Sequence, residues 1–373
     1  MYILGINLSH HASLCLMKDG ETIYYLEDDR WSGEKEAHWS LEDEIRSFRD
    51  LPKYTHHIDH IIFTSFCRGE RYESIKDDDG IIVSDKQLIE KIKKDLSDWS
   101  ITYDNCHYFI EHHLYHACSA FYGSGFDEAA ALIMDGTGAY FRDYIHNREC
   151  ESMYHFPEVG KVELLNSVYT PSNFLYYDPP FKIESNKTLS STLSCGSIFA
   201  AIQVATQIYS PGKLMGLSPY GDLSVSEEDD EWYSYDENTN HWYSNNKTIL
   251  NSIRKLLNNP YLSTHDGDTI RSSTLRQKSN LAKKVQIESK EHTIHLIELL
   301  LDKVDTKNIV LSGGYFLNCV NNYEYIKKFP EINFYIDPMA HDGGTSYGGV
   351  KYVWHHLLNK KEKYPLETLF LGG

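Results

Sequence analysis

Short apolar runs separated by polar turns dominate the N-terminal part of the chain, a pattern typical of strands joined by tight connections. Strands are predicted at Tyr2–Leu8, Leu14–Met17, Thr22–Leu26, Ile61–Thr64 and His107–Ile110. The first three form an antiparallel meander, because residues 18–21 have the composition of a hairpin turn. Helices are predicted at Leu41–Phe48 and at Asp85–Leu96, where Ile89, Ile92 and Leu96 share one face.

The same order of elements begins again at Ala129. Further strands are predicted at Ala129–Met134, Tyr140–His146, Ser152–Phe156, Ile309–Leu311 and Ile332–Ile336. Further helices are predicted at Thr192–Ile208, Asp266–Leu301 (one helix or two), Tyr315–Phe329 and Thr345–Leu358. Asn166–Asn186 is expected to be irregular, 212–221 a glycine-rich loop, and Ser224–Asn246 the least structured stretch. The repetition indicates two similar α/β lobes on mixed sheets.

We expect residues 1–124 to form the first lobe and residues 125–373 the second. The second lobe is expected to carry insertions at about 222–250 and a C-terminal helix free to pack back on the first lobe.

Charge and cysteine usage narrow the classes of partner. The 373 residues carry a formal net charge of −18, so neither nucleic acid nor an anionic membrane surface is an expected partner. The seven cysteines include no CxxC pair, which favours reduced thiols over a disulfide framework. No signal peptide and no run of about 18 apolar residues is present, so a cytoplasmic protein is expected.

A histidine pair near the middle of the chain is the first candidate for chemistry. His112 and His116 are four residues apart, which on a helix places both imidazoles on one face. Asp135 follows a predicted buried strand and stands before Gly136 and Gly138. Two imidazoles and a carboxylate suit zinc, iron or a similar divalent ion. A helix that merely carries surface histidines is the alternative, and Asp342 is either a further ligand or a turn former.

Small residues and glycines follow several predicted strands. Such turns lie at Asn7–Ser13, 135–138, 312–314 and 342–344. Their backbone N–H groups can cradle phosphates, so a nucleotide between the lobes is expected, although neither a P-loop nor a GxGxxG is present. The candidate nucleotide-binding residues are Asn7, Ser13, Gly136, Thr137, Gly138, Lys213, Gly216, Ser312, Gly313, Gly314 and Asn318. His10, in the first turn, is a candidate general base.

Taken together, these stretches resemble the carbamoyltransferase family of antibiotic and Nod-factor biosynthesis. The residues that carry the resemblance are Ile3–Asn7, His10–Ser13, Lys18–Gly20, Glu27–Ser32, His112–Tyr122, Ser124–Phe126, Asp135–Gly138, Gly212–Gly221, Ser312–Gly314, Leu317–Asn318 and Asp342–Thr345. His11 departs from the family pattern, which usually has Asp there. The resemblance implies an actin-like, sugar-kinase-like fold of two ribonuclease-H-like lobes with a nucleotide cleft between them, a fold shared with the tRNA threonylcarbamoyl transferases.

The resemblance also implies a reaction. His112, His116, Asp135 and Asp342 match the family's metal ligands, with Fe or a Zn- or Mn-type ion as cofactor and Mg²⁺ as a further candidate. His10 matches its base, and ATP or carbamoyl-adenylate would lie on the glycine turns. The expected activity is metal-dependent transfer of a carbamoyl or related acyl group from an adenylate to a hydroxyl or amine of a small natural-product intermediate. Family members continue into an adenylate-forming domain, so a separate protein is expected to supply that step here. The alternatives are a non-catalytic scaffold subunit and a transferase of another acyl group.

Overall fold

The computed structural model describes residues 1–8, 11–35, 46–65, 83–108, 111–136, 138–141, 144–171, 181–190, 193–223, 231–258, 273–369 and 371. The first of its two main sheets has the strand order β3-β2-β1-β4-β5. These strands are β1 (Tyr2–Asn7), β2 (Ser13–Lys18), β3 (Glu21–Glu27), β4 (His57–Ser65) and β5 (Thr102–Tyr108). The first three pair antiparallel, as the meander predicted, whereas β1, β4 and β5 run parallel.

The second sheet has the order β10-β11-β9-β8-β6-β14-β15, with β7 paired to β8. Its strands are β6 (Ala129–Met134), β7 (Tyr140–Phe141), β8 (Tyr144–Phe156), β9 (Glu163–Pro171), β10 (Phe181–Glu184), β11 (Lys187–Leu189), β14 (Asn308–Ser312) and β15 (Asn333–Ile336). From β9 to β15 the strand directions repeat those of β3 to β5. The expected recurrence of one α/β topology is therefore confirmed.

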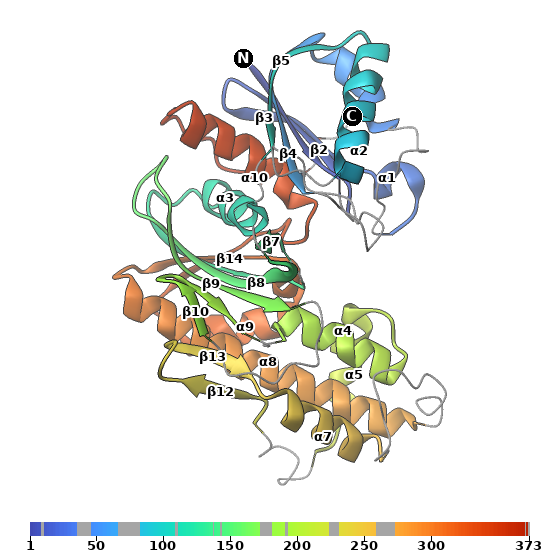
Figure 1. The fold of residues 1–373 in the computed structure, drawn as a ribbon, viewed down its shortest axis with the longest axis vertical. Coiled ribbons are helices and arrows are strands. Elements are labelled where there is room, and N and C mark those ends of the chain that lie inside the picture. Colours follow the sequence, from blue (N-terminus) through green and yellow to red (C-terminus); the bar gives the residue numbers. More distant parts are fainter. Residues whose placement is uncertain are drawn as a thin grey trace.

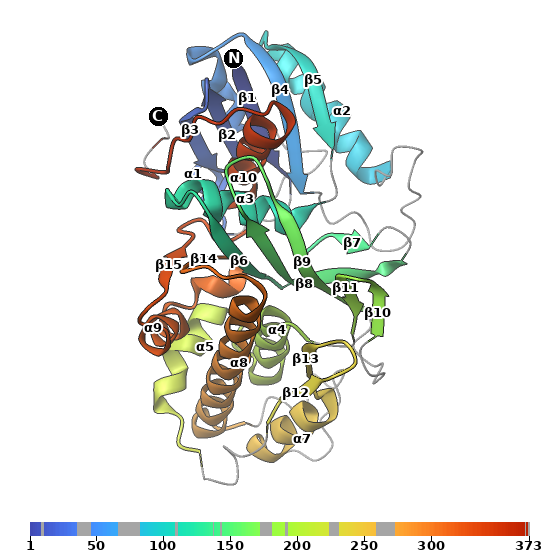
Figure 2. The same ribbon diagram turned by 90° about the vertical axis from the view of Figure 1, so that its left-hand side faces the viewer.

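Two helices lie between the sheets, α3 (His112–Ser124) and α10 (Gly344–Tyr352) (Figures 1 and 2). Helix α3 packs on β6, β8 and β14 of the second sheet, and α10 packs on β1, β2 and β4 of the first. The outer face of the first sheet is covered by α2 (Val83–Asp98), whose predicted apolar face joins that core. The outer face of the second is covered by α4 (Cys195–Thr206) and α8 (Leu275–Lys303). The molecule is thus a stack of five alternating helix and sheet layers.

Close contact between α3 and α10 depends on Gly348. A Cβ atom at this position would lie 1.9 Å from the carbonyl oxygen of Tyr115 on α3. Only glycine allows the two backbones to cross this closely. Because Asp342 stands just before α10, the crossing also brings that carboxylate next to the histidines of α3.

Several local predictions were wrong. Asn166–Asn186 is not irregular throughout, because it contains the end of β9 and the whole of β10; residues 172–180 lie outside the described chain. Ser224–Asn246 contains a hairpin, β12 (Tyr233–Asp236) with β13 (His241–Ser244). The expected loop at 212–221 is mostly helical, because Ser210 caps α5 (Pro211–Leu217) and a 3₁₀ turn, η2 (Ser218–Tyr220), follows.

Four of the remaining elements refine predicted boundaries: η1 (Arg46–Lys53), η4 (Gly314–Leu317), α9 (Cys319–Lys328) and the π-helical turn η5 (Val353–Leu357). Two helices were not predicted, α1 (Asp29–Ser32) and α7 (Asn246–Leu256). The helix expected at Leu41–Phe48 is described only from Arg46, where it is a 3₁₀ helix. The helical region expected from Asp266 is the single helix α8 over its described part. The lobe boundary at residue 124 stays a prediction.

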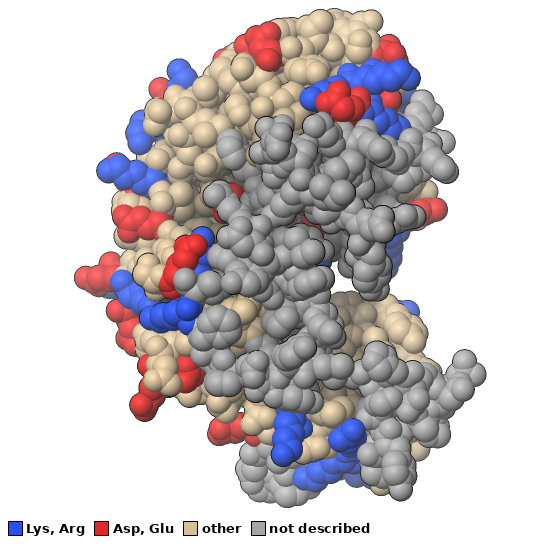
Figure 3. All heavy atoms as spheres, viewed as in Figure 1, with Lys and Arg blue, Asp and Glu red and all other residues tan. Residues whose placement is uncertain are grey.

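Two further features of the described residues are the composition of the helices and the distribution of surface charge. None of the helices in the described ranges is long and apolar enough to cross a membrane. On the face drawn in Figure 3, the described Lys, Arg, Asp and Glu side chains are interspersed along the margin of the molecule. The two signs of charge are therefore mixed on this part of the surface (Figure 3).

Candidate metal centre

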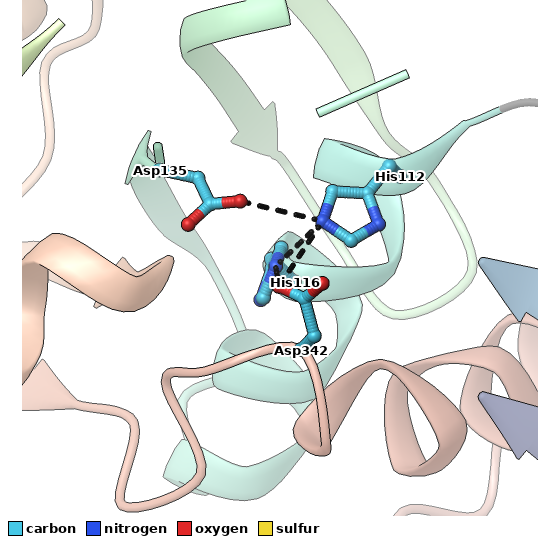
Figure 4. Close-up of side chains that lie close together, drawn as sticks. All are labelled: His112, His116, Asp135 and Asp342. Atoms are coloured by element: carbon cyan, nitrogen blue, oxygen red, sulfur yellow. Dashed lines mark hydrogen bonds and ion pairs between the residues drawn. The ribbon is translucent and has the colours of Figure 1, made fainter. Parts of the chain in front are cut away.

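Four side chains from three segments converge between the two sheets. His112 and His116 extend from successive turns of α3, Asp135 follows β6, and Asp342 precedes α10, and all four point toward one another (Figure 4). The Nε2 atoms of His112 and His116 are 3.2 Å apart. The structure therefore brings together the four residues that were expected to bind a metal.

The carboxylates complete this arrangement. His112 Nε2 lies 3.5 Å from Asp135 Oδ2 and 3.5 Å from Asp342 Oδ1. His116 Nε2 lies 3.7 Å from the same oxygen of Asp342. Around an ion with bonds of about 2.0–2.2 Å, neighbouring ligand atoms lie roughly 3.0–3.6 Å apart. All four residues are buried. Their donor set of two nitrogens and two oxygens, at these separations, fits a divalent metal ion.

Backbone contacts fix the orientation of Asp135. The amide of Gly314 donates a hydrogen bond of 3.1 Å to Asp135 Oδ1, so the other oxygen faces His112. The hydroxyl of Ser194 donates to the Asp135 carbonyl over 2.8 Å. Asp135 is thus held from β14 on one side and from the start of α4 on the other.

The charges of the cluster depend on one another. Burial disfavours protonation of His112, but Asp342 and Asp135 outweigh it and raise the pKa of this imidazole to about 10. Burial and Asp342 act to raise the pKa of Asp135, yet its contacts with His112 and His116 hold that pKa well below the ordinary value. Two buried carboxylates need a positive charge among them, which a proton on His112 or a bound cation supplies.

Two functional candidates next to the cluster were not predicted from the sequence. His113 is fully buried and its Nδ1 atom lies 2.8 Å from the Ser152 hydroxyl. Glu149 accepts hydrogen bonds from the backbone amides of His113 and Ala139. Burial, with a contribution from Glu111, raises the pKa of Glu149 to about 7. The position of His113 next to His112 could have identified it from the sequence, whereas no local sequence pattern distinguishes Glu149.

The predicted nucleotide-binding residues at the strand ends of the first sheet are engaged within the protein. Asn7 is buried, and its side-chain amide donates to the carbonyl of His11 over 2.9 Å. The hydroxyl of Ser13 donates to the carbonyl of Gly343 over 2.7 Å. Ser13 therefore ties β2 to the loop that carries Asp342.

The candidates in the second lobe differ in position. Gly136, Gly138, Ser312, Gly313 and Gly314 lie at the ends of β6 and β14, around Asp135. Asn318 is buried, and its side chain exchanges hydrogen bonds with Gln286 while it caps α9. Lys213 and Gly216 lie exposed on α5, which packs on α8 and α4. The candidates His10 and Thr137 lie outside the described residues.

The chain is similar in sequence to one protein family and to several individual proteins. The family model described as "Carbamoyltransferase N-terminus" matches residues 2–350. An uncharacterized protein of Synechocystis sp., sll1178, is 24% identical and aligns with 96% of this chain and 58% of its own length. The nodulation protein NolNO of Sinorhizobium fredii is 22% identical over 71% of this chain and 34% of its own. The chain therefore spans about a third to somewhat over half of the length of these relatives.

A solved structure shares the fold. Full-length HypF, in a phosphate- and nucleotide-bound form, superimposes with a TM-score of 0.52 and 15% sequence identity. The alignment covers 94% of this chain and 55% of HypF. Together with the repeated sheet topology, this likeness confirms the expected two-lobed fold.

Proposed function

Because the chain belongs to the carbamoyltransferase family, we propose that it transfers a carbamoyl or closely related acyl group from an adenylate to a hydroxyl or amine of a small molecule. Family membership agrees with the expectation of a transferase. The observation that carries the proposal is the convergence of His112, His116, Asp135 and Asp342 on one point between the two sheets. A buried set of this kind, at ligand spacing, is more than a structural ion pair requires.

The four side chains would hold one divalent ion, Fe or a Zn- or Mn-type ion, with Mg²⁺ as a further candidate. Such an ion supplies Lewis acidity, which withdraws charge from an acyl or phosphoryl oxygen. The orientation of the ligand side chains determines on which side of the ion the substrate can bind. Asp135 keeps one oxygen toward His112 because Gly314 holds the other.

The adenylate is assigned to the strand-end turns around Asp135. Gly136 lies beside the start of α4, since its carbonyl accepts a hydrogen bond of 2.7 Å from the Ser197 hydroxyl. Gly313 and Gly314 follow β14 on the other side. Backbone N–H groups in such turns can receive phosphate oxygens. The nucleotide-bound form of HypF, which has the same fold, supports an adenylate here.

Proton removal from the acceptor is assigned to His10. This residue lies in the connection between β1 and β2, outside the described residues. The end of that connection faces the Asp342 loop, because the rings of His11 and His341 stack with centroids 4.4 Å apart. A histidine at neutral pH can take the proton of a hydroxyl or amine as the acyl group is attacked, and AMP leaves.

Formation of the adenylate is assigned to protein outside these 373 residues. Both described sheets flank the helices that carry the candidate site, so neither forms a separate activating unit. The relatives are longer than this chain, so they have room for an additional adenylate-forming unit. The acceptor is proposed to be an intermediate of natural-product biosynthesis, such as an antibiotic precursor.

An AMP-release assay tests the proposal. The protein is given preformed carbamoyl-adenylate with a panel of hydroxyl- and amine-bearing acceptors, and in parallel carbamoyl phosphate, ATP and Mg²⁺. We expect acceptor-dependent AMP release only in the first arm, and its loss in His116→Ala. Release of pyrophosphate in the second arm would mean that the chain makes the adenylate itself. Adenylate binding without release for any acceptor would favour a scaffold subunit, and release with other acyl-adenylates only would change the acyl group.

A further inference from the structure

A second group of potential metal ligands lies on the far face of the second sheet. Glu151 on β8, Cys195 at the start of α4 and His292 on α8 each offer one ligand atom, and these atoms lie within 4.8 Å of one another. All three residues are almost completely buried. They come from a strand and two helices that are widely separated in sequence but packed together in the core (Figure 2).

A bulge in β8 separates this group from the first site. The register between β8 and β9 shifts between Glu149 and Glu151. Glu149 therefore faces α3, where it meets the His113 amide, while Glu151 faces α8, where its Oε1 lies 2.9 Å from His292 Nε2. A bulge re-aims side chains in this way. The two clusters lie on opposite faces of one sheet.

The surroundings of Glu151 hold its carboxylate in position. Its second oxygen, Oε2, lies 3.5 Å from His241 Nε2. His241 Nδ1 in turn lies 3.1 Å from the side-chain amide of Asn166. If that amide donates, the His241 proton is on Nε2 and faces Glu151. The ring of His292 stacks on Tyr233, with centroids 3.8 Å apart, which fixes its plane.

Several buried polar atoms of this core are poorly satisfied. Among the described residues, His292 Nδ1 is buried without a hydrogen bond, and Glu151 Oε2 and His241 Nε2 have only their mutual contact of 3.5 Å. The Cys195 thiol lies 3.5 Å from the Tyr233 hydroxyl and 3.8 Å from the Ser289 carbonyl, distances that are ordinary for hydrogen bonds to sulfur. Buried polar atoms left unsatisfied are costly, so an ion bound among these side chains would offset part of that cost.

We propose that Glu151, Cys195 and His292 bind a second transition-metal ion, of which Zn²⁺ is the best match, and that His241 positions the carboxylate. Thiolate, imidazole and carboxylate are the ligand types of zinc, with bonds of about 2.0–2.3 Å. Binding removes the thiol proton, which passes to solvent. The ion would join β8, α4 and α8. Since Ser194, next to Cys195, holds the Asp135 carbonyl, the ion would also steady the first site.

Cobalt substitution distinguishes the two sites, because only the second contains sulfur. The apoprotein is titrated with Co²⁺ and followed by thiolate-to-cobalt charge-transfer absorption. We expect one equivalent of this absorption in the wild type and in His116→Ala, and none in Cys195→Ala. Cys150→Ala is the matched control, since this buried thiol is next to Glu151 but donates to the Val168 carbonyl. It should keep the absorption.

The wild-type titration alone can overturn the proposal, even if Cys195→Ala does not fold. Absence of thiolate absorption would show that Glu151 and His292 form only a buried ion pair. If Cys195→Ala kept the wild-type thiolate-to-cobalt absorption, or if Cys150→Ala lost it, the sulfur ligand would be a cysteine other than Cys195. None of these results depends on carbamoyl transfer, so the proposed reaction stands or falls separately.

Discussion

The backbone amide of Gly314 donates a hydrogen bond of 3.1 Å to the carboxylate of Asp135. This contact joins the ends of two adjacent parallel strands, β6 and β14. It leaves one oxygen of Asp135 directed at His112, 3.5 Å away. The geometry of the candidate metal centre therefore depends on the order of the strands in the sheet as well as on the spacing of the histidines in α3.

The first prediction concerns the crossing of α3 and α10. In Gly348→Ala the new Cβ would meet the Tyr115 carbonyl, so α10 must shift and move Asp342 with it. We expect a loss of about 1–3 kcal/mol in unfolding free energy, the usual cost of overpacking, together with weaker metal binding at the first site. Urea unfolding and metal titration measure the two effects.

A glycine of another helix provides the control for this substitution. In Gly212→Ala the new Cβ would come no closer than 3.9 Å to Ser210 Oγ, and the residue is exposed. This variant should keep its stability and metal affinity. Wild-type behaviour in Gly348→Ala would show that the close crossing does not position Asp342.

The second prediction concerns the proposed base. His10→Ala should lower acyl transfer by roughly 10²–10⁴-fold, the usual range for acid–base catalysis, because the acceptor proton then has no recipient. Affinity for a non-reactive sulfamoyl-adenosine analogue, measured by calorimetry, should not change. The exposed His57 of the same lobe provides the matched variant His57→Ala. Full turnover in His10→Ala would remove its assignment as the base.

The third prediction is a pH dependence of stability. Burial of His355 lowers its pKa to about 3, and its Nδ1 lies 2.8 Å from the carbonyl of Lys360. The unfolded chain binds a proton below about pH 6.5 and the folded chain does not until about pH 3, so the unfolding free energy falls as the pH falls between these values. This histidine contributes on the order of 4 kcal/mol of that loss.

Comparison of His355→Gln with the wild type isolates this contribution. The glutamine amide can still donate to the Lys360 carbonyl but does not titrate. Its unfolding free energy should depend less steeply on pH between 6.5 and 4, whereas the exposed His57→Gln should follow the wild type. Parallel curves for His355→Gln and wild type would show that His355 is not kept neutral by burial.

The sequence was sufficient for those features that short apolar runs and local spacing determine. The runs at 2–8, 129–134 and 309–311 became central strands, because strands buried on both faces are nearly continuous in apolar residues. The i,i+4 spacing of His112 and His116 placed both rings on one side of α3. Strand ends followed by glycines located Asp135, since polar residues there cannot continue a buried strand.

Features that depend on long-range packing were missed. The β12–β13 hairpin is stabilised by contacts with α8, where Tyr233 stacks on His292, and its strands contain no aliphatic residue that would mark them in the sequence. The segment around Lys213 was predicted to be a loop because it is rich in glycine. The signal for a helix start, Ser210 as the cap followed by Pro211, was present but was not used. The roles of Glu149 and Glu151 depend on a bulge, which no local pattern reveals.

The metal content of the purified protein decides whether the four side chains between the sheets bind an ion. Wild type, His116→Ala and the exposed control His56→Ala are purified in parallel and analysed for iron, zinc and manganese per chain. We expect one equivalent of metal less in His116→Ala than in the wild type, and the wild-type amount in His56→Ala. Equal metal in all three proteins would contradict a metal centre at His112, His116, Asp135 and Asp342.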